Sequence, residues 1–330
     1  SRIVIRGATS MVGNNQALII IDGVRSNNET LNAQGTGTAG TAQSNRLMDL
    51  NSEDIENISV LKGAAATAVY GTAGSGGVVL ITTKKGAEGQ KLQVNVSSQV
   101  AFDKISQLIS LQDTYAQGRV AAGVPVWRGP ETGESGSWGP RLADLEYSTN
   151  INDYDDENGN QGAAFDTEGI YRWDNNGFLV PRGQGNGIAA NNYNKLNNED
   201  FFRTGISLTN NVGISGSNEN LTYRFSVSNL KQEGIVPNEE YLRKTFNLGA
   251  TYKATDKLSF ETAMNYTRSD YNRIQQGSNT SGLLLGQLRT PASFDNSNGL
   301  GIAARDNPLG YEFADRSQRN YRGGGGYDNP

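Results

Sequence analysis

The chain has 330 residues, of which 35% are hydrophobic, 41 are glycine and 8 are proline, a composition typical of many strands joined by turns and polar loops. It contains no cysteine and no histidine, which excludes disulfides and thiolate metal sites and removes the commonest general base. The net charge of −5, with acidic and basic residues interspersed, argues against nucleic acid as a partner. Enzyme functions therefore start at a disadvantage.

Short β-branched runs bounded by Gly, Asp or Asn recur in the first ninety residues, as strands do. An alanine-rich helix is predicted over 64–70, with Gly71 just after its last turn. Asn51 or Ser52 is expected to cap a short acidic turn ahead of the third run. Together these elements predict a small α+β unit, with its strands at 3–5, 18–21, 58–61 and 78–83.

The glycine-rich stretch "VLKGAAATAVYGTAGSGGVVLITTKKG" at 60–86 raises the question of a phosphate-binding loop. Gly71 and Gly76 have the spacing of such a loop, but Gly77 stands where lysine is required and Val78 where Ser or Thr is required. The order helix, loop, strand is also the reverse of the one that presents a helix N-terminus to phosphate. A tight helix-to-strand turn is therefore the better interpretation than nucleotide binding.

Three segments of this region carry a family resemblance: "IRG" at 5–7, "ALIIIDGVRSNN" from Ala17, and "LNSEDIENISVLKGAAATAVYGTAGSGGVVLITTKKG" from Leu50. They resemble the plug domain of TonB-dependent outer-membrane transporters. The form "DIENISVLKGAAATAVYG" followed by "GGVVLITTKKG" is similar to the SusC-like importers of Bacteroidota. Gly63 departs from the SusC-like pattern, which usually has Asp there, so one capping carboxylate is missing.

From residue 92 onward the sequence alternates between apolar and polar residues, which predicts strands with one lipid-facing and one lumen-facing side. Further alternating rows are predicted at 206–214, 221–227, 246–252 and 258–266. A soluble sandwich would also alternate, but tight turns at 216–220 and 254–257 on one side and long connections on the other favour an outer-membrane barrel. The first row is Leu92, Val94, Val96, Ser98, Val100 and Phe102, opposite Gln93, Asn95, Ser97 and Gln99.

The predicted fold class is a membrane all-β protein, in which a large antiparallel transmembrane β-barrel holds a small α+β plug domain. By resemblance the complete barrel has 22 strands, and about five lie in this chain, which is therefore expected to be a fragment without the N-terminal extension and the TonB box. The plug is predicted at 1–89 and the first part of the barrel at 90–330. Its long extracellular loops are expected at 103–203, 229–241 and 267–330.

Candidate binding residues are polar or aromatic and lie in the predicted loops. The segment 26–44 reads as an apical plug loop whose amides suit sugar hydroxyls or peptide backbones, with a passive loop as the alternative. Aromatic rings in the first long loop suit stacking on a sugar, although packing or contact with a partner protein is the better explanation of these rings. Trp138 in particular is better explained by packing than by binding. The tentative substrate-binding set is Asn27, Asn28, Asn32, Gln34, Gln43, Trp127, Tyr154 and Trp173.

The acidic segment "NDYDDENGN" at 152–160 resembles a calcium loop, because Asp153, Asp155 and Glu157 alternate as oxygen ligands. The glycine required at its sixth position is displaced and Ala164 stands where a bidentate glutamate belongs. A solvated acidic turn is the alternative, and these residues are only weak metal candidates.

The resemblance implies a function without bond chemistry or cofactors. It implies energy-dependent import of oligomeric nutrients, glycan oligosaccharides or peptides, across the outer membrane of a Gram-negative bacterium of the Bacteroidota. The implied partners are a SusD-like surface lipoprotein that acts as a lid, the TonB–ExbB–ExbD complex that transmits the proton-motive force, and outer-membrane lipid. The alternative is a secreted or surface β-rich adhesin or structural protein without transport.

Overall fold

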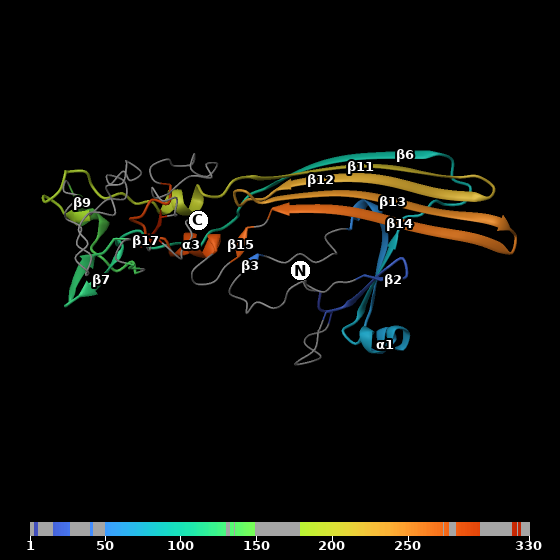
Figure 1. The fold of residues 1–330 in the computed structure, drawn as a ribbon, viewed down its shortest axis with the longest axis horizontal. Coiled ribbons are helices and arrows are strands. Elements are labelled where there is room, and N and C mark those ends of the chain that lie inside the picture. Colours follow the sequence, from blue (N-terminus) through green and yellow to red (C-terminus); the bar gives the residue numbers. More distant parts are fainter. Residues whose placement is uncertain are drawn as a thin grey trace.

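The computed structural model describes three parts: a small N-terminal unit, a long antiparallel sheet, and a layer of short elements beyond one end of that sheet (Figure 1). No helix among the described residues is long and apolar enough to cross a membrane. The structure describes residues 3–5, 16–26, 40–41, 50–129, 133–134, 136–148, 179–272, 274–276, 282–297, 319–321 and 323–324.

The N-terminal unit (residues 16–26 and 50–86) is a four-stranded sheet in the order β2-β1-β5-β4 with one helix. β1 and β5 run parallel, and the other two pairs are antiparallel. The predicted helix is confirmed residue for residue, and Asn51 is the predicted cap, because its side chain accepts a hydrogen bond from the amide of Glu53. The elements are β1 (Leu18–Ile21), β2 (Val24–Ser26), a 3-10 turn (Ser52–Asp54), β4 (Ile55–Leu61), α1 (Ala64–Tyr70), a second 3-10 turn (Gly71–Gly74) and β5 (Val78–Thr83).

Apolar side chains cover both faces of this small sheet, which explains why β1 is the uninterrupted run "LIII" rather than an alternating one. Ile19 and Ile81 belong to the core on one face, while Leu18 and Val78 pack with α1 on the other. The β1–β2 hairpin turns on Asp22 and Gly23, both with positive φ, as a two-residue turn of this kind requires. The unit is thus a compact body with two small cores.

The long sheet contains the five strands that the alternating pattern predicted, all antiparallel and in the order β14-β13-β12-β11-β6. The described residues do not close a barrel. The turns β11–β12 and β13–β14 lie at the end opposite the loop layer (Figure 1). The strands are β6 (Gln93–Asp103), β11 (Gly205–Ser217), β12 (Leu221–Glu233), β13 (Glu240–Thr255) and β14 (Leu258–Asn272).

Several strands of the long sheet extend beyond their predicted ends. The connection predicted at 229–241 is only 234–239, and β14 continues beyond 266 as far as Asn272. The apolar alternation stops before the strands do, because charged residues replace apolar ones on the same face while the backbone ladder continues. Side-chain polarity therefore marked the end of the apolar band rather than the end of the strand.

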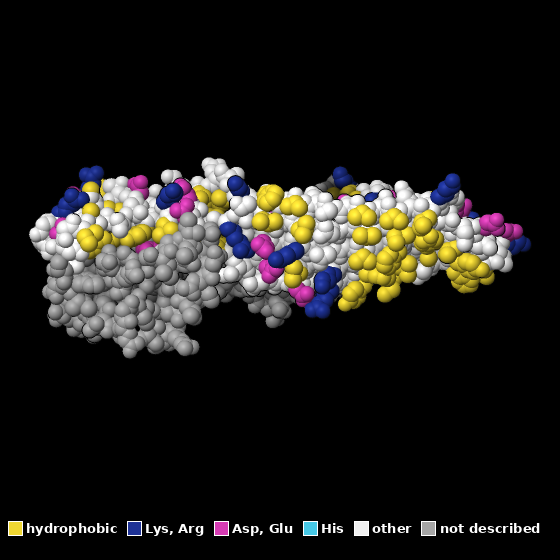
Figure 2. Space-filling model, turned by 90° about the horizontal axis from the view of Figure 1, so that it is seen from above, with side chains coloured by type: hydrophobic (Ala, Val, Ile, Leu, Met, Phe, Trp, Pro, Cys, Tyr) yellow, Lys and Arg dark blue, Asp and Glu magenta, His cyan; other side chains and the backbone are white. Residues whose placement is uncertain are grey.

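The two faces of the long sheet have different surroundings. Its outward face, turned away from the N-terminal unit, bears an apolar band (Figure 2), in which Val94 is 57%, Val96 72% and Val100 53% exposed. A soluble sandwich would require these three valines to be buried against a second sheet, and no described element covers them. The inward face is polar and largely buried, with Asn211, Ser215, Arg224, Ser226, Ser228, Arg243, Thr245 and Asn247 all under 9% exposed.

The loop layer (residues 104–148, 179–204 and 282–297) fills most of the segment predicted as the first long loop and adds part of the last one. Its core contains Tyr147, Leu145, Leu142 and Leu179, and burial raises the pKa of Tyr147. Its elements are β7 (Gly118–Ala121), β8 (Val124–Trp127), a 3-10 turn (Leu142–Asp144), β9 (Leu145–Tyr147), β10 (Leu179–Pro181), a π-helix (Lys195–Glu199) and α3 (Leu283–Arg289). Three two-residue strands complete the fold beside these: β15 (Gln275–Gln276), β16 (Arg319–Asn320) and β17 (Gly323–Gly324).

Candidate functional site

The N-terminal unit is fastened to the inward face of the sheet by a buried carboxylate. Asp54 ends the 3-10 turn ahead of β4 and is 5% exposed. Its Oδ1 accepts hydrogen bonds from Arg224 Nη2 at 3.2 Å and from Ser226 Oγ at 2.5 Å, and its Oδ2 accepts from Asn51 Nδ2 at 3.1 Å. Arg224 and Ser226 are inward residues of β12. A buried ion pair therefore joins the two parts.

Residues on either side of Asp54 extend this contact to the neighbouring strands. Asn51 Nδ2 also donates to Asn211 Oδ1 on β11 at 3.3 Å, and Arg243 Nη1 on β13 donates to the carbonyl of Leu50 at 2.7 Å. The segment 50–54 thus bonds to three adjacent strands. Because Asn51 caps the turn that holds Asp54, local helix capping and docking on the sheet depend on each other.

A second, exposed contact lies near the turns of the sheet. Lys85 pairs with Glu261 on β14, and that hydrogen bond raises the pKa of Lys85. Lys253 pairs with Glu88. Between these pairs, Gly86 lies against the backbone of β12, where an added Cβ would be 2.6 Å from the Tyr223 carbonyl oxygen. Only glycine permits so close an approach.

The two contacts differ in strength. The side chains of Asp54 and Arg224 are 7% and 8% exposed, so removing one partner leaves an uncompensated buried charge, a loss of about 3–5 kcal/mol. The exposed pair of Lys253 and Glu88 contributes about 0–1 kcal/mol at most. Arg224 Nε is buried and has no hydrogen-bond partner among the described residues. The ion pair of Asp54 and Arg224 is thus the strong contact of the described interface, although the hydrogen-bonding capacity of the Arg224 guanidinium is not fully used.

A third contact, made by backbone alone, involves two residues of the segment predicted as an apical loop. β3 (Gly40–Thr41) pairs antiparallel with β15, in the register Gly40 to Gln276 and Thr41 to Gln275. This short ladder links the segment predicted as an apical loop to the chain that follows β14. Main-chain pairing of this kind sets position without specifying side chains.

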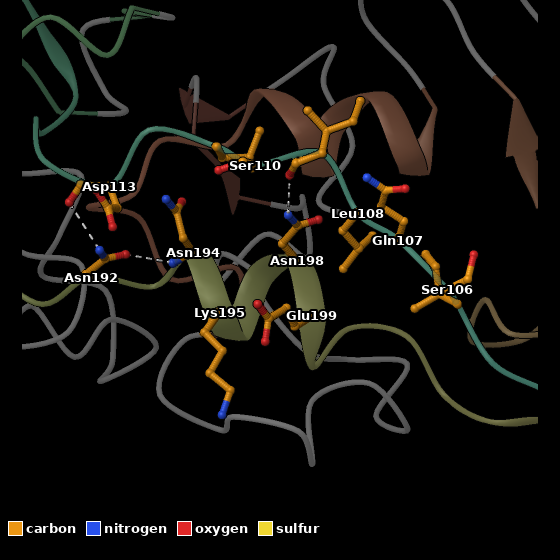
Figure 3. A pocket seen from close by; sticks show the side chains of 13 residues that line it. Ser106, Gln107, Leu108, Ser110, Asp113, Asn192, Asn194, Lys195, Asn198 and Glu199 are labelled. Carbon is orange, nitrogen blue, oxygen red and sulfur yellow. Dashed lines mark hydrogen bonds between the residues drawn. The ribbon is translucent and has the colours of Figure 1, made fainter.

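A half-open cavity of about 720 Å³ lies in the loop layer, between the chain that leaves β6 and the π-helix (Figure 3). Asparagine side chains of the π-helix segment bond to main-chain carbonyls on the other side and so hold the two walls at a fixed spacing. These bonds run from Asn192 to Asp113 at 3.1 Å, from Asn194 to Gln112 at 2.6 Å and from Asn198 to Ile109 at 3.5 Å.

The side chains of Ser106, Gln107, Lys195 and Glu199 also line this cavity. Hydroxyl, amide and charged groups on walls of fixed spacing suit a hydroxylated or amide-bearing ligand. Sequence reasoning did not single out this pocket. The clustered asparagines at 191–198 were its available signal, and most of them position the walls rather than face a ligand.

Of the predicted substrate-binding residues, the structure describes only Trp127, whose ring packs against the core of the loop layer. Trp138, expected to pack, is instead 71% exposed, with its ring centroid 6.4 Å from that of Tyr115. The amides of Trp138 and Gly139 donate hydrogen bonds to the carbonyls of Gly118 and Ala116, so the backbone is held in place while the ring remains exposed. The other predicted positions, which lie outside the described residues, are Asn27, Asn28, Asn32, Gln34, Gln43, Tyr154 and Trp173.

The weak metal candidates Asp153, Asp155 and Glu157 also lie outside the described residues. Within the part of the chain that the structure does describe, no group of three or more His, Cys, Asp or Glu side chains is placed to hold a metal ion. The buried pair of Asp54 and Arg224 was not singled out from the sequence.

The arrangement is thus a small α+β unit held by a buried ion pair on the polar face of an antiparallel sheet, as in a plug docked on barrel strands. The TonB-dependent Receptor Plug Domain family matches residues 1–78. The chain is 28% identical over 246 residues to the TonB-dependent receptor SusC of Bacteroides thetaiotaomicron, which covers 74% of this chain and 18% of that protein. It is 26% identical over 274 residues to a TonB-dependent receptor of Formosa agariphila, covering 82% of this chain and 21% of that protein.

The fold agrees with these relatives. The chain superposes on a structure of the RagAB peptide importer in its open-open state with a TM-score of 0.51 and 15% identity, covering 93% of this chain and 30% of that one. Residues 1–78 match the plug-domain family and most of the chain is similar to SusC-like TonB-dependent receptors, so the predicted resemblance is confirmed. It spans about a fifth of the length of the curated relatives it matches. The N-terminal unit is hereafter called the plug.

Proposed function

We propose that this chain is the plug and the first strands of an outer-membrane importer of oligomeric nutrients, and that the plug must leave the polar face of the sheet for cargo to pass. In this proposal the plug comprises residues 1–89 and the barrel begins at residue 90, with the complete barrel reaching 22 strands. The loops at the loop-layer end face the exterior. The observation that supports it best is the buried ion pair of Asp54 with Arg224, which joins the plug to the polar face of the sheet.

The apolar band supports the placement in a membrane. On β6, the outward row from Val94 to Phe102 spans eight residue steps, or about 27 Å at ~3.4 Å per step. For a strand tilted by about 35–45° this length covers about 19–22 Å of height, most of the apolar height of about 25 Å in outer-membrane barrels. The inward residues opposite are polar, as a wet interior holding a plug requires. Similarity to TonB-dependent receptors supports import rather than bond chemistry.

Cargo and partners are proposed from the relatives. We propose glycan oligosaccharides as the cargo, with peptides as the other class, because one relative is SusC and one structural neighbour is described as a peptide importer. The energy is proposed to come from the proton-motive force through TonB with ExbB and ExbD. A SusD-like lipoprotein is proposed to close the outer side, and the cavity beside the π-helix is the proposed first contact for cargo.

A disulfide across the plug–sheet interface tests the proposal. The printed sequence contains no cysteine, and the side chains of Asn51 and Asn211 meet at 3.3 Å. In the full-length receptor, Asn51→Cys with Asn211→Cys is expected to stop uptake of labelled oligosaccharides and peptides under oxidising conditions and to restore it with reductant. Each single cysteine variant is the control.

Uptake that is equal in the oxidised and reduced double variant would contradict plug release. Uptake that is unaffected by deletion of TonB would contradict the energy source. Absence of any uptake by the unmodified receptor, together with adhesion of cells that carry it, would favour the adhesin alternative.

A further inference from the structure

The outward face of β13 and β14 places two cations directly opposite each other. Lys244 pairs in register with Arg268, and both side chains are exposed. Directly opposed side chains have Cβ atoms about 4.5–5.5 Å apart, and like charges at that spacing destabilise a sheet. An anion shared by the two side chains would reverse that effect. The two opposed cations therefore form a candidate binding site for an anion.

Lys244 and Arg268 lie next to the apolar band of the outward face. The next outward pair toward the turns is Phe246 with Tyr266, at the edge of the apolar band, and Tyr266 is 58% exposed. Lys244 and Arg268 are thus the first charged residues beyond the band on these two strands. Beside them on β12 lies Asn229, in register with Lys244, whose amide adds a further donor.

Acidic residues on the same face lie mainly farther from the band. Glu233 and Glu240 stand opposite each other near the loop-layer ends of their strands, and Lys231 pairs with both, at 2.8 Å and 3.7 Å. Arg268 Nε bonds to Asp270 Oδ2 at 3.2 Å. The charge order from the band outward is therefore cationic first and acidic later (Figure 2). An anion is therefore attracted to the edge of the apolar band, where Lys244 and Arg268 lie.

Given the proposed membrane placement, on which this inference rests, we propose that Lys244 and Arg268 bind the headgroup phosphate of an outer-leaflet lipid whose acyl chains cover the apolar band. Guanidinium and ammonium groups both form charge-assisted hydrogen bonds to phosphate. The aromatic pair beneath them lies at the depth where such rings meet the headgroups. The occupant is a lipid and not free phosphate, because the apolar surface continues directly from the basic pair.

The test uses the purified full-length receptor in detergent micelles doped with a phosphorylated glycolipid, lipid A, or with the same lipid after removal of its phosphates. Each basic residue near a charged lipid surface adds about 1 kcal/mol, so Lys244→Gln with Arg268→Gln is expected to weaken binding of the phosphorylated lipid by about 30-fold. The dephosphorylated lipid is expected to bind the receptor and this variant equally. Native mass spectrometry measures the bound lipid.

The matched control removes two exposed cations from the loop layer, Arg182→Gln with Lys195→Gln, and is expected to bind the phosphorylated lipid as the unmodified receptor does. The charge-retaining variant Lys244→Arg with Arg268→Lys is expected to keep binding within about 3-fold, because phosphate accepts from either group, and it guards against loss through misfolding. Equal binding of the two lipids by the unmodified receptor overturns the proposal, and so does an equal loss in the control variant. Uptake by the double Gln variant is expected to persist, so a failure of lipid binding and a failure of import are read out separately.

Discussion

Removal of the Asp54 carboxylate is expected to loosen the plug from the sheet more than any neighbouring surface change. Asp54→Ala leaves the Arg224 guanidinium, 8% exposed, without its counter-charge and removes the acceptor for Ser226. Breaking a buried pair in this way costs about 3–5 kcal/mol. At about 1.4 kcal/mol per factor of ten, the population of the open plug is expected to rise at least about 100-fold.

A single cysteine beneath the plug measures this population. Asn247 lies inward on β13, is 5% exposed and lines a cavity of about 540 Å³ together with Leu50 and Thr83 of the plug. The thiol of Asn247→Cys is therefore expected to react with a polyethylene-glycol maleimide, which is too large for that cavity, only when the plug opens. When closing is faster than labelling, the labelling rate tracks the open population. The Asp54→Ala variant is expected to label at least about 100-fold faster, while Glu53→Ala, which removes an adjacent exposed carboxylate, is expected to label at the unmodified rate.

A second substitution distinguishes the effect of losing the ion pair from the effect of leaving one buried charge without a partner. Asp54→Ala combined with Arg224→Met removes both charges and keeps much of the buried volume, a change that is often close to neutral for a buried pair. The labelling rate of the reporter cysteine in this double variant is therefore expected to lie within about tenfold of the rate in the unmodified receptor. An increase of less than about threefold in Asp54→Ala alone, or no recovery in the double variant, would refute the assignment of this pair as the principal contact.

Three further predictions follow from other contacts of the chain. Gly86→Ala brings a Cβ to 2.6 Å from a main-chain oxygen of β12, so it is expected to weaken docking by about 1–3 kcal/mol, read as faster labelling of the same reporter cysteine. Asp22→Ala removes the acceptor for the amide and hydroxyl of Thr83, at 2.8 and 2.7 Å, and is expected to lower the urea midpoint of the plug by an amount equal to about 1–3 kcal/mol, whereas Asp22→Asn is expected to lose less. Trp127→Ala is expected to speed proteolysis of the loop layer, because Trp127 packs against the core of that layer. Trp138→Ala, at an exposed ring, is expected to change the stability of the loop layer by no more than about 0.5 kcal/mol. Equal effects of the two changes would contradict the packing described here.

Local patterns predicted the elements well because each depends on neighbouring residues. The helix at 64–70 was predicted correctly because an alanine run favours helix and Gly71, with a φ of 60°, ends it. The five long strands were predicted correctly because apolar outward residues alternate with polar inward residues along each of them. Their ends were missed where charged residues such as Lys231 and Glu233 take over the outward positions.

The site itself depends on contacts that no local pattern encodes. Asp54 and Arg224 are 170 positions apart, and an aspartate after a capping residue reads as part of the cap. A guanidinium at an inward position of an alternating strand was the available signal, because a charge among small polar residues needs a partner. The predicted substrate residues in the apical segment, such as Asn27 and Gln43, stay predictions.

The chemistry of the inward face is consistent with a plug that must come away. Apart from Arg224 and Arg243, the buried inward residues are small and polar, among them Ser226, Ser228 and Asn211. Hydrogen bonds exchanged for bonds to water are each worth only about 0.5–1.5 kcal/mol. An apolar interface of the same extent would resist separation in proportion to its area, at about 25 cal/mol per Å². Among the described residues, the buried pair of Asp54 and Arg224 is the strongest contact of the plug. Under the proposed import function, a pull on the plug breaks this pair before the weaker contacts separate in turn.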